Sequence, residues 1–422
     1  MTKHQNPVSC DFDSNSITVA QAMAHIRETI VPITDQETID VYSALGRVTA
    51  KDIVSAFNVP NHTNSAMDGY AVNGNALPKV NSKGFELVGA SFAGAPYHGS
   101  VGPDQCVRIM TGGVMPEGAD TVVVQERVAH VEGRVDGRVV IPAGDKIGAN
   151  VRYAGEDLKV GDIAIPEGIK LGASQMGLAA SLGMKEITVF RRPKIAYFSN
   201  GDELRSVGNP LEIGEVYDSN RYTLHAMLSE LGVQQFDLGI IKDDLDAIAN
   251  AFKAAAEDAD MIITTAGASV GDADYVKQAL AGLGEVSFWK VAIKPGRPMS
   301  FGKLNNSLFF GLPGNPVSVM VTFQIFVKAA IKRLSGEKFS VPLVLKVKTL
   351  SDLKKRPGRM EYQRGVLSLD ENGETVVSST GQQGSGILSS MSLANCYIIL
   401  SDESQGAKAG DWVEVQPIDQ NC

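Results

Sequence analysis

Two segments of the chain combine glycines, hydroxyl side chains and acids in the pattern of a strand-to-helix loop. They run from Thr264 to Tyr275 (TTAGASVGDADY) and from Gly311 to Ser318 (GLPGNPVS). Each follows a short apolar run and precedes a helical pattern, so each is expected to present backbone N–H groups at the positive end of a helix, where anions bind. Asp272 and Asp274 lie in the first loop. Carboxylates repel phosphates unless a cation lies between them, so we expect a phosphate-bearing ligand with a divalent cation.

Acidic residues follow the ends of several predicted strands of the same sheet. They are Asp202, Glu203, Asp243, Asp244, Asp272 and Asp274. The carboxyl ends of parallel strands share one edge of a sheet, so these side chains are expected at one rim. Such a rim could hold magnesium against a pyrophosphate, with one carboxylate left to activate water. Acids also cap helix N-termini, and this alternative applies to each position taken alone.

The second loop offers a rigid backbone and a hydroxyl for binding an anion. The prolines of Pro313–Pro316 restrict the loop directly ahead of a helix, and Ser318 adds a hydroxyl in its first turn. A turn and helix cap without a ligand explains the same residues. Upstream, Trp289 and a group of cations lie near this loop, although lysines on loops are usually only solvated. Those cations are Lys290, Lys294 and Arg297.

Composition favours an acidic protein of the cytoplasm with several domains. The 422 residues exceed one core's usual size, and the net charge of -9 argues against binding nucleic acid. The four cysteines are far apart and form no C-x-x-C pair, which fits a reducing compartment and supports neither a zinc ribbon nor a disulfide framework. The N-terminus has no apolar signal segment and no run is long enough to span a membrane, so we expect no membrane contact.

The order of strand and helix patterns predicts four regions. A linking domain takes residues 17–46 and 149–190, an inserted β-rich domain 47–148, an α/β domain 191–336 and a small β-barrel-like domain 337–420. In the α/β region apolar strands alternate with helices, which predicts a three-layer α/β/α domain around a mostly parallel sheet.

Helical spacing at 17–30, with Thr18 as cap, predicts an N-terminal helix, and a second helical piece is expected at 37–45. The helix at 174–181 is expected to pair back with these N-terminal helices. In the α/β region we expect helices at 219–231, 245–257, 273–283 and 317–334.

Two motifs in the inserted domain do not indicate any catalytic or binding role by themselves. They are Asn64–Ala71 (NSAMDGYA) and Arg108–Gly113 (RIMTGG), and their Asp-Gly and Gly-Gly pairs are ordinary hairpin signals. The chain carries no G-x-x-x-x-G-K-[ST], no G-x-S-x-G and no strand-bound G-x-G-x-x-G. This argues against a P-loop ATPase, a serine hydrolase and a dinucleotide dehydrogenase.

At these residues the chain resembles the molybdopterin molybdenumtransferases, the MoeA family related to the C-terminal domain of gephyrin. The matching motifs extend from about residue 17 to residue 418 in one order. They are Asn64–Val72, Arg108–Glu126, Gly201–Leu204, Tyr217–Arg221, Thr264–Tyr275, Ala292–Gly296, Gly311–Ser318 and Thr380–Ser385.

The resemblance implies an enzyme that inserts molybdate into adenylylated molybdopterin and releases AMP, with Mg²⁺ as the expected ion. It implies a homodimer whose active site lies at the subunit interface. Molybdopterin adenylyltransferase and molybdoenzymes or their chaperones are implied as partners. Molybdate, a tetrahedral oxyanion, suits N–H, Ser and Lys donors, and substrate sulfurs rather than cysteines would hold the metal.

By motif match the sheet domain supplies Glu203, Asp243 and Asp274 as catalytic residues and metal ligands. Asp68 and Thr111 face the same cleft from the partner's inserted domain. Which carboxylate binds metal and which activates water stays open. Substrate and anion binding is assigned to Thr264, Gly267, Ser269, Gly271, Lys290, Lys294, Pro313, Gly314, Asn315, Pro316, Ser318 and Ser385.

Two positions depart from the family pattern. Ala266 replaces a glycine of the first loop, and Asn200 replaces the usual threonine ahead of Gly201. If the loop position needs a positive φ, alanine there costs roughly 1 kcal/mol and weakens anion binding.

Two other functions remain as alternatives. One is the molybdopterin adenylyltransferase, whose stand-alone proteins share the sheet domain but lack the two β domains. The other is a non-catalytic, gephyrin-like scaffold. The retained carboxylates argue against it.

Overall fold

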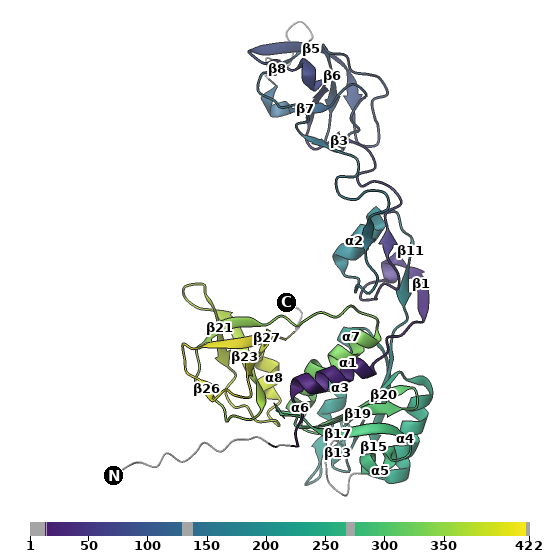
Figure 1. Ribbon diagram of the computed structural model, residues 1–422, viewed down its shortest axis with the longest axis vertical. Helices are drawn as coiled ribbons and strands as arrows, with labels where there is room; N and C mark the ends of the chain where they lie inside the picture. Colours follow the sequence, from purple (N-terminus) through teal and green to yellow (C-terminus); the bar gives the residue numbers. More distant parts are fainter. Residues whose placement is uncertain (1–12, 14, 129–137, 267–274, 419–422) are drawn as a thin grey trace, which may run out of the picture.

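The computed structural model describes residues 13, 15–128, 138–266 and 275–418. The molecule is elongated and bent: an α/β domain and a C-terminal β-barrel lie side by side, and a narrow linking region carries a β-rich domain away from them (Figure 1). None of the helices in the described ranges has both the length and the apolar character needed to cross a membrane.

A six-stranded sheet forms the centre of the α/β domain, in the order β15-β12-β16-β20-β19-β17. Its strands are β12 (Lys194–Asn200), β15 (Gln234–Ile241), β16 (Met261–Thr265), β17 (Gly284–Lys290), β19 (Pro298–Leu304) and β20 (Ser307–Leu312). The first four in the spatial order run parallel, and β19 and β17 add an antiparallel edge. The expected mostly parallel sheet is therefore confirmed.

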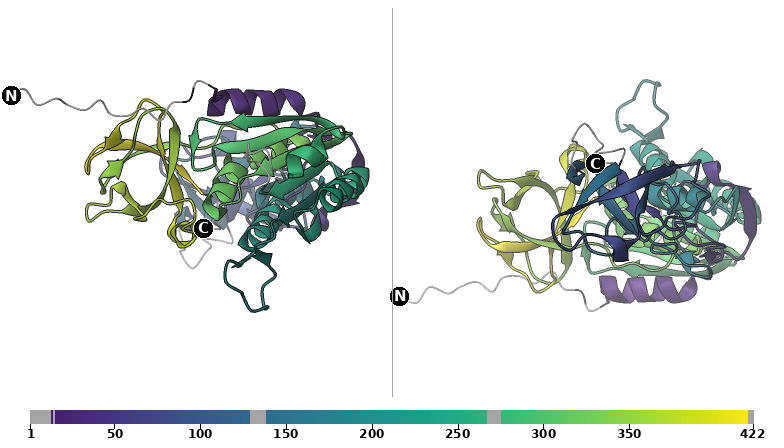
Figure 2. Two further views of the ribbon diagram at one scale, coloured as in Figure 1. Left: turned by 90° about the horizontal axis from the view of Figure 1, so that it is seen from below. Right: turned by 90° about the horizontal axis from the view of Figure 1, so that it is seen from above.

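Helices cover both faces of this sheet, as a three-layer α/β/α domain requires. α1 (Val19–Thr29), α3 (Ser219–Leu231) and the helix from α6 (Pro316–Thr322) through a π-helical segment (Phe323–Val327) to α7 (Lys328–Leu334) bury one face. α4 (Leu245–Asp258) and α5 (Tyr275–Leu280) bury the other. Figure 2 shows α1 lying along the sheet with the barrel beside the domain. The short strands β13 (Leu204–Arg205) and β14 (Val216–Tyr217) pair outside the sheet.

The linking region is small and built mostly of paired short strands. β1 (Gln36–Asp40) pairs with β11 (Glu186–Phe190), and β2 (Ile53–Val54) pairs with β10 (Ile163–Ile165). A 3-10 turn (Val41–Ser43) and α2 (Ala173–Ser181) complete it around one apolar cluster.

The inserted domain is a five-stranded sheet in the order β7-β4-β6-β5-β8 with a short side pair, β3–β9. Its elements are β3 (Asn64–Ser65), β4 (Gly69–Val72), β5 (Ser82–Ser91), β6 (Gln105–Ile109), β7 (Thr121–Val124), β8 (Arg138–Pro142) and β9 (Val151–Arg152), with 3-10 turns at Gly74–Ala76 and Gln125–Arg127.

The C-terminal domain is a closed five-stranded barrel, because β23 pairs with both β24 and β25. Its elements are β21 (Leu345–Thr349), β22 (Leu353–Lys354), β23 (Met360–Leu369), β24 (Thr375–Ser379), α8 (Ser389–Leu393), β25 (Cys396–Leu400), β26 (Gly406–Ala407) and β27 (Trp412–Pro417). One strand of the α/β region, β18 (Ile293–Lys294), pairs with β23, so the two domains share backbone hydrogen bonds.

One local expectation is wrong and another holds only in part, because distant partners override local spacing. The segment expected as a helix at 37–45 begins as β1, since Thr38 and Ile39 pair with β11 about 150 residues later. The helix at 174–181 packs against the end of that segment, where Val41 shares its apolar cluster, but not against α1, which joins the core of the α/β sheet. The domain boundaries as such stay a prediction.

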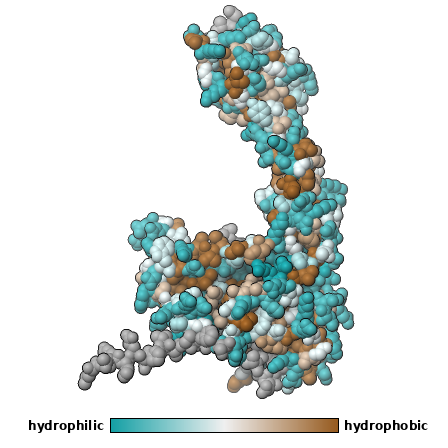
Figure 3. All heavy atoms as spheres, viewed as in Figure 1, coloured by the Kyte–Doolittle hydropathy of each residue, from teal (hydrophilic) through white to brown (hydrophobic). Residues whose placement is uncertain are grey.

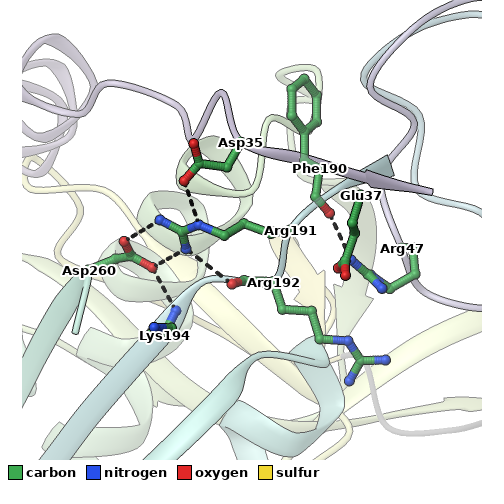
Figure 4. A network of polar contacts seen from close by, with 8 residues as sticks. All are labelled: Asp35, Glu37, Arg47, Phe190, Arg191, Arg192, Lys194 and Asp260. Atoms are coloured by element: carbon green, nitrogen blue, oxygen red, sulfur yellow. Dashed lines mark hydrogen bonds and ion pairs between the residues drawn. The ribbon is translucent and has the colours of Figure 1, made fainter. Parts of the chain in front are cut away.

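Arg191 fixes the linking region to the α/β domain. The chain passes between these two parts twice, near Asp35 and near Arg191 itself. Its guanidinium donates two hydrogen bonds to Asp260, at 2.7 and 2.8 Å, and one to Asp35 at 2.9 Å (Figure 4). The bonds to Asp260, followed by that to Asp35, raise the pKa of Arg191 against the effect of burial. Asp260 also accepts a hydrogen bond from the backbone N–H of Lys194, the first residue of β12. Both connections between the two parts are therefore bonded to the first strand of the sheet.

Asp260→Asn is expected to loosen this junction, because the neutral amide has only one acceptor oxygen for Arg191. We expect a loss of about 2 kcal/mol in unfolding free energy. Spin labels on α4 and β5 should show a broader distance distribution by electron–electron double resonance. Asp258→Asn at the exposed end of α4 is the matched control. An unchanged distribution and melting temperature in Asp260→Asn would contradict the assignment.

Candidate functional site

A cavity of about 540 Å³ lies between the α/β domain and the C-terminal barrel. The α/β domain contributes strand-end and loop residues, and the barrel contributes a glycine-rich turn. The lining residues are Ala266, Lys294, Pro295, Gly296, Arg297, Pro298, Pro313, Gly314, Asn315, Ser318, Arg359, Gln383, Gly384 and Ser385. Six of the predicted anion-binding residues therefore share one cavity: Lys294, Pro313, Gly314, Asn315, Ser318 and Ser385.

Backbone contacts hold the barrel's turn against the start of α6. The Val317 N–H donates to the Ser385 carbonyl at 3.1 Å. On the barrel side, the buried Arg364 donates to the Gly384 carbonyl at 2.9 Å and to Ser390 Oγ at 3.0 Å. Pro316 is the first residue of α6, and no side chain caps the helix. The N-terminal end of a helix thus faces a cavity whose walls are fixed from two domains.

Two of the cations at this cavity, Lys294 and Arg297, are held in place by acids. Lys294 Nζ lies 3.0 Å from the Glu361 carboxylate, which is 3% exposed and accepts a second bond from Gln363 Nε2. Arg297 pairs with Asp13. The fixed cations and hydroxyls are suited to an oxyanion, because charge-assisted hydrogen bonds from oriented donors are the strong ones.

The carboxylate rim forms where β12 and β15 end side by side. Asn200 Nδ2 donates to Asp243 Oδ1 at 3.0 Å, and the Asp243 N–H donates to Asp202 Oδ1 at 3.3 Å. Glu203 folds back over Gly201, where a Cβ would meet its Oε2 at 2.6 Å. The structure therefore brings Asp243 and Glu203 to one corner of the sheet, as the sequence pattern predicts. Asp244 instead caps α4, since its Oδ1 accepts from the Ala247 N–H.

This corner fits a hard divalent cation in its donor chemistry. The atoms that the described residues offer to a metal here are carboxylate oxygens, and no described residue donates a hydrogen bond to the buried Asn200 Oδ1. Within the described ranges alone, no three metal-ligating side chains come close enough to hold an ion. Asp274, the third acid assigned by motif, lies outside those ranges.

Asp68 and Thr111 form a separate pair in the inserted domain. The Thr111 backbone N–H and hydroxyl both donate to Asp68 Oδ1, at 2.7 and 2.8 Å, and these bonds lower the pKa of Asp68 below its ordinary value. The carboxylate is therefore charged at neutral pH. Within one chain this domain stands at the opposite end of the molecule from the sheet, so the pair does not meet the cavity (Figure 1).

The remaining predicted residues lie elsewhere. Thr264, whose side chain is buried in the sheet, and Lys290, which pairs with Asp13 at 3.7 Å, are not among the residues that line the cavity. Pro316 begins α6 beside it. Gly267, Ser269, Gly271, Asp272 and Asp274 lie outside the described residues.

Sequence reasoning missed one wall of the cavity. Arg359 and Gln383 come from the barrel, at positions without a local motif for anion binding. Arg359 follows a turn, and Gln383 belongs to the TGQQGS segment that carried the resemblance. The pairing of β18 with β23 brings this wall to Lys294, and that long-range contact has no sequence signal.

Ala266, which stands where the family has a glycine, adopts a positive φ. Its φ is 80°, and its Cβ lies 3.7 Å from the position a Cβ on Gly314 would take. The left-handed conformation is unfavourable for alanine, and the structure holds it through a bond from the Ala266 N–H to the Leu312 carbonyl. The expected strain at this position is therefore confirmed.

Ala266→Gly is expected to stabilise the α/β domain by about 1 kcal/mol, the left-handed penalty less the greater flexibility of glycine when unfolded. The measurement is urea denaturation followed by the fluorescence of Trp289, in a background with Trp412→Phe. Ala259→Gly, at a position with φ of -91°, is the control and should destabilise. A lower urea midpoint for Ala266→Gly than for the unsubstituted background would contradict the conclusion that Ala266 is strained.

Three family models cover nearly the whole chain. The MoeA N-terminal region (domain I and II) matches residues 17–183, a probable molybdopterin binding domain matches 196–333, and the MoeA C-terminal region (domain IV) matches 346–418.

Relatives and solved structures agree with these matches. The molybdopterin molybdenumtransferase of Haemophilus influenzae is 41% identical over 402 residues, covering 95% of this chain and 98% of the relative. That of a Nostoc species is 34% identical over 422 residues, covering 94% and 95%. The crystal structure of a molybdopterin biosynthesis MoeA protein from Pyrococcus horikoshii superposes with a TM-score of 0.82 at 26% identity, covering 96% of this chain and all of that one.

Proposed function

The chain belongs to the MoeA family, the molybdopterin molybdenumtransferases, and from this premise we propose that it inserts molybdate into adenylylated molybdopterin in the cytoplasm and releases AMP. It is a transferase of molybdenum cofactor biosynthesis. The reaction needs a place for an oxyanion, a place for the adenylate phosphates, and a group that activates the attacking oxygen.

The cavity between the α/β domain and the barrel is the observation that supports the proposal most strongly. Molybdate is a tetrahedral dianion, and the cavity offers Lys294 and Arg297, the hydroxyl of Ser318 and the turn at Ser385. Glu361 holds Lys294 from outside the cavity, so the ammonium is oriented before the anion arrives. Oriented donors stabilise bound charge without having to reorganise.

The carboxylate corner is the proposed place of adenylate cleavage. Asp243 is fixed through Asn200 and Glu203 lies over Gly201, so these two oxygen groups, with Asp274, would hold a Mg²⁺ ion. When bound, the ion neutralises the charge of the phosphates. One of the carboxylates would accept a proton from the water that attacks the phosphoanhydride; the oxygen of that water bonds to phosphorus, the bridging P–O bond breaks, and AMP leaves.

We further propose that two chains form a homodimer in which Asp68 and Thr111 of one subunit reach the sheet corner of the other. The linking region exposes large apolar side chains: Tyr42 is 91% exposed, Leu45 63%, Val54 51% and Ile163 52%. Figure 3 shows brown, apolar surface on this narrow part of the molecule. Exposed apolar surface of this kind is typical of protein interfaces.

The test is to incubate the purified protein with adenylylated molybdopterin, molybdate and Mg²⁺. The expected result is release of AMP that depends on both molybdate and protein, with molybdenum recovered on the pterin. No AMP under any divalent cation would overturn the proposal. Adenylylation of free molybdopterin with ATP would instead support the adenylyltransferase alternative.

A further inference from the structure

Asn200 lies at the carboxyl end of β12, next to the acids of the proposed site. It pairs in register with Ile241 of β15, two residues before Asp243. Its residue exposure is only 6%, so the side chain is held inside the corner rather than in solvent. The asparagine amide has a donor, its NH₂ group, and an acceptor, its carbonyl oxygen. Burying it at this position therefore requires a hydrogen-bond partner for each group.

One end of the amide has its partner. Asn200 Nδ2 donates to Asp243 Oδ1 at 3.0 Å, while the Asp243 backbone N–H is bonded to Asp202. These two bonds fix both the backbone and the carboxylate of Asp243. A neutral donor orients the carboxylate without adding a counter-charge, and no described residue donates to Asp243 Oδ2, so that oxygen is left for a ligand.

The other end of the amide has none. Asn200 Oδ1 is buried and accepts no hydrogen bond from the described residues. Buried amide oxygens nearly always have a donor, so an orphaned one beside a ligand site indicates a donor that arrives with the ligand. Mg²⁺ retains several of its waters when bound by carboxylates, and each such water is a strong donor.

We propose that Asn200 is a positioning residue for the transfer reaction: its Nδ2 orients Asp243, and its Oδ1 accepts a hydrogen bond from a water of the divalent cation. The role of Asn200 in the reaction rests on the proposed function. Its effect on cation binding can be measured without substrate. A threonine at this position has a single hydroxyl oxygen on a shorter side chain. That hydroxyl can also donate one bond and accept another, but both must meet at one atom, whereas the amide separates its donor from its acceptor and can reach two partners that lie apart.

The first measurement is Mn²⁺ binding to the full-length protein without substrate, followed by electron paramagnetic resonance. Asn200→Leu keeps the size of the side chain and removes both hydrogen bonds. We expect about tenfold weaker Mn²⁺ binding, the loss typical of an outer-sphere partner of a metal ligand. The conservative variant Asn200→Gln, which keeps both polar ends, should recover part of this loss.

The second measurement separates kcat from KM in AMP release. Asn200→Leu should lower kcat about tenfold and leave the KM for molybdate unchanged, because molybdate is proposed to bind in the cavity rather than at this corner. If the wild-type protein released no AMP, the proposed function would fail, while the Mn²⁺ comparison would still decide the role of Asn200.

Asn395 supplies the matched control. It makes two hydrogen bonds to the backbone of Leu367 in the barrel, at 2.7 and 3.0 Å. Asn395→Leu should lower the melting temperature and leave Mn²⁺ affinity and kcat as they are. A folded Asn200→Leu with wild-type Mn²⁺ affinity and kcat would overturn the proposal, and so would an equal loss in Asn395→Leu.

Discussion

Asp243→Asn is expected to slow the release of AMP by about 100-fold or more, the usual cost of removing a group that handles protons or charge in a reaction. The substitution keeps an oxygen to accept the bond from Asn200, so the corner should keep its shape while it loses a negative charge. The expected loss lies in kcat, with the melting temperature close to that of the wild type.

The next residue provides the control for this variant. Asp244 caps α4 through its bond from the Ala247 N–H at 2.8 Å, and asparagine caps helices about as well as aspartate. Asp244→Asn should therefore leave both stability and AMP release unchanged. Full activity in Asp243→Asn, or an equal loss in Asp244→Asn, would remove Asp243 from the proposed chemistry.

Asp68→Asn is expected to cause a loss of similar size, about 100-fold, although its inserted domain lies at the opposite end of the molecule from the sheet (Figure 1). Asp68 is held as a charged group by the two bonds from Thr111. Two donors on one carboxylate oxygen leave the second oxygen to face a neighbour. The amide can still accept both bonds, so the turn should survive while the charge is lost.

Asp120 is the matched control within the same domain. Its Oδ1 accepts from the Gly74 N–H at 2.6 Å and from the Thr121 hydroxyl at 2.8 Å, so its role is to hold a turn. AMP release should be unaffected in Asp120→Asn at a temperature where the domain is folded. Light scattering must show the same oligomeric state for both variants. Wild-type activity in Asp68→Asn would exclude the inserted domain from the site.

The parts of the structure that sequence could predict are those set by local spacing. The helix at 219–231 has the expected bounds, with Asp218 as its cap, and Thr18 caps α1 as expected. In both helices, the residues that determine the conformation are neighbours in the chain. The positive φ of Ala266 was raised by the resemblance, because the family has a glycine at that position.

What sequence could not predict depends on distant pairing. β1 forms because Glu186–Phe190 is available to it, and its own residues also fit a helix. No strand was expected at Pro298–Leu304, which forms β19 by pairing antiparallel with both β17 and β20. The cavity needs the barrel's turn against α6, and the bond from Asn200 to Asp243 joins two strand ends about forty residues apart.

The most direct test of the account uses mixed dimers of two inactive variants. Asp68→Asn and Asp243→Asn chains are unfolded together, refolded and assayed for AMP release. If each site combines the inserted domain of one chain with the sheet of the other, every mixed dimer has one site without a substitution. Random pairing should then restore about a quarter of wild-type activity. Activity no higher than that of the separate variants, with mixed dimers shown to be present, would contradict a site shared between subunits.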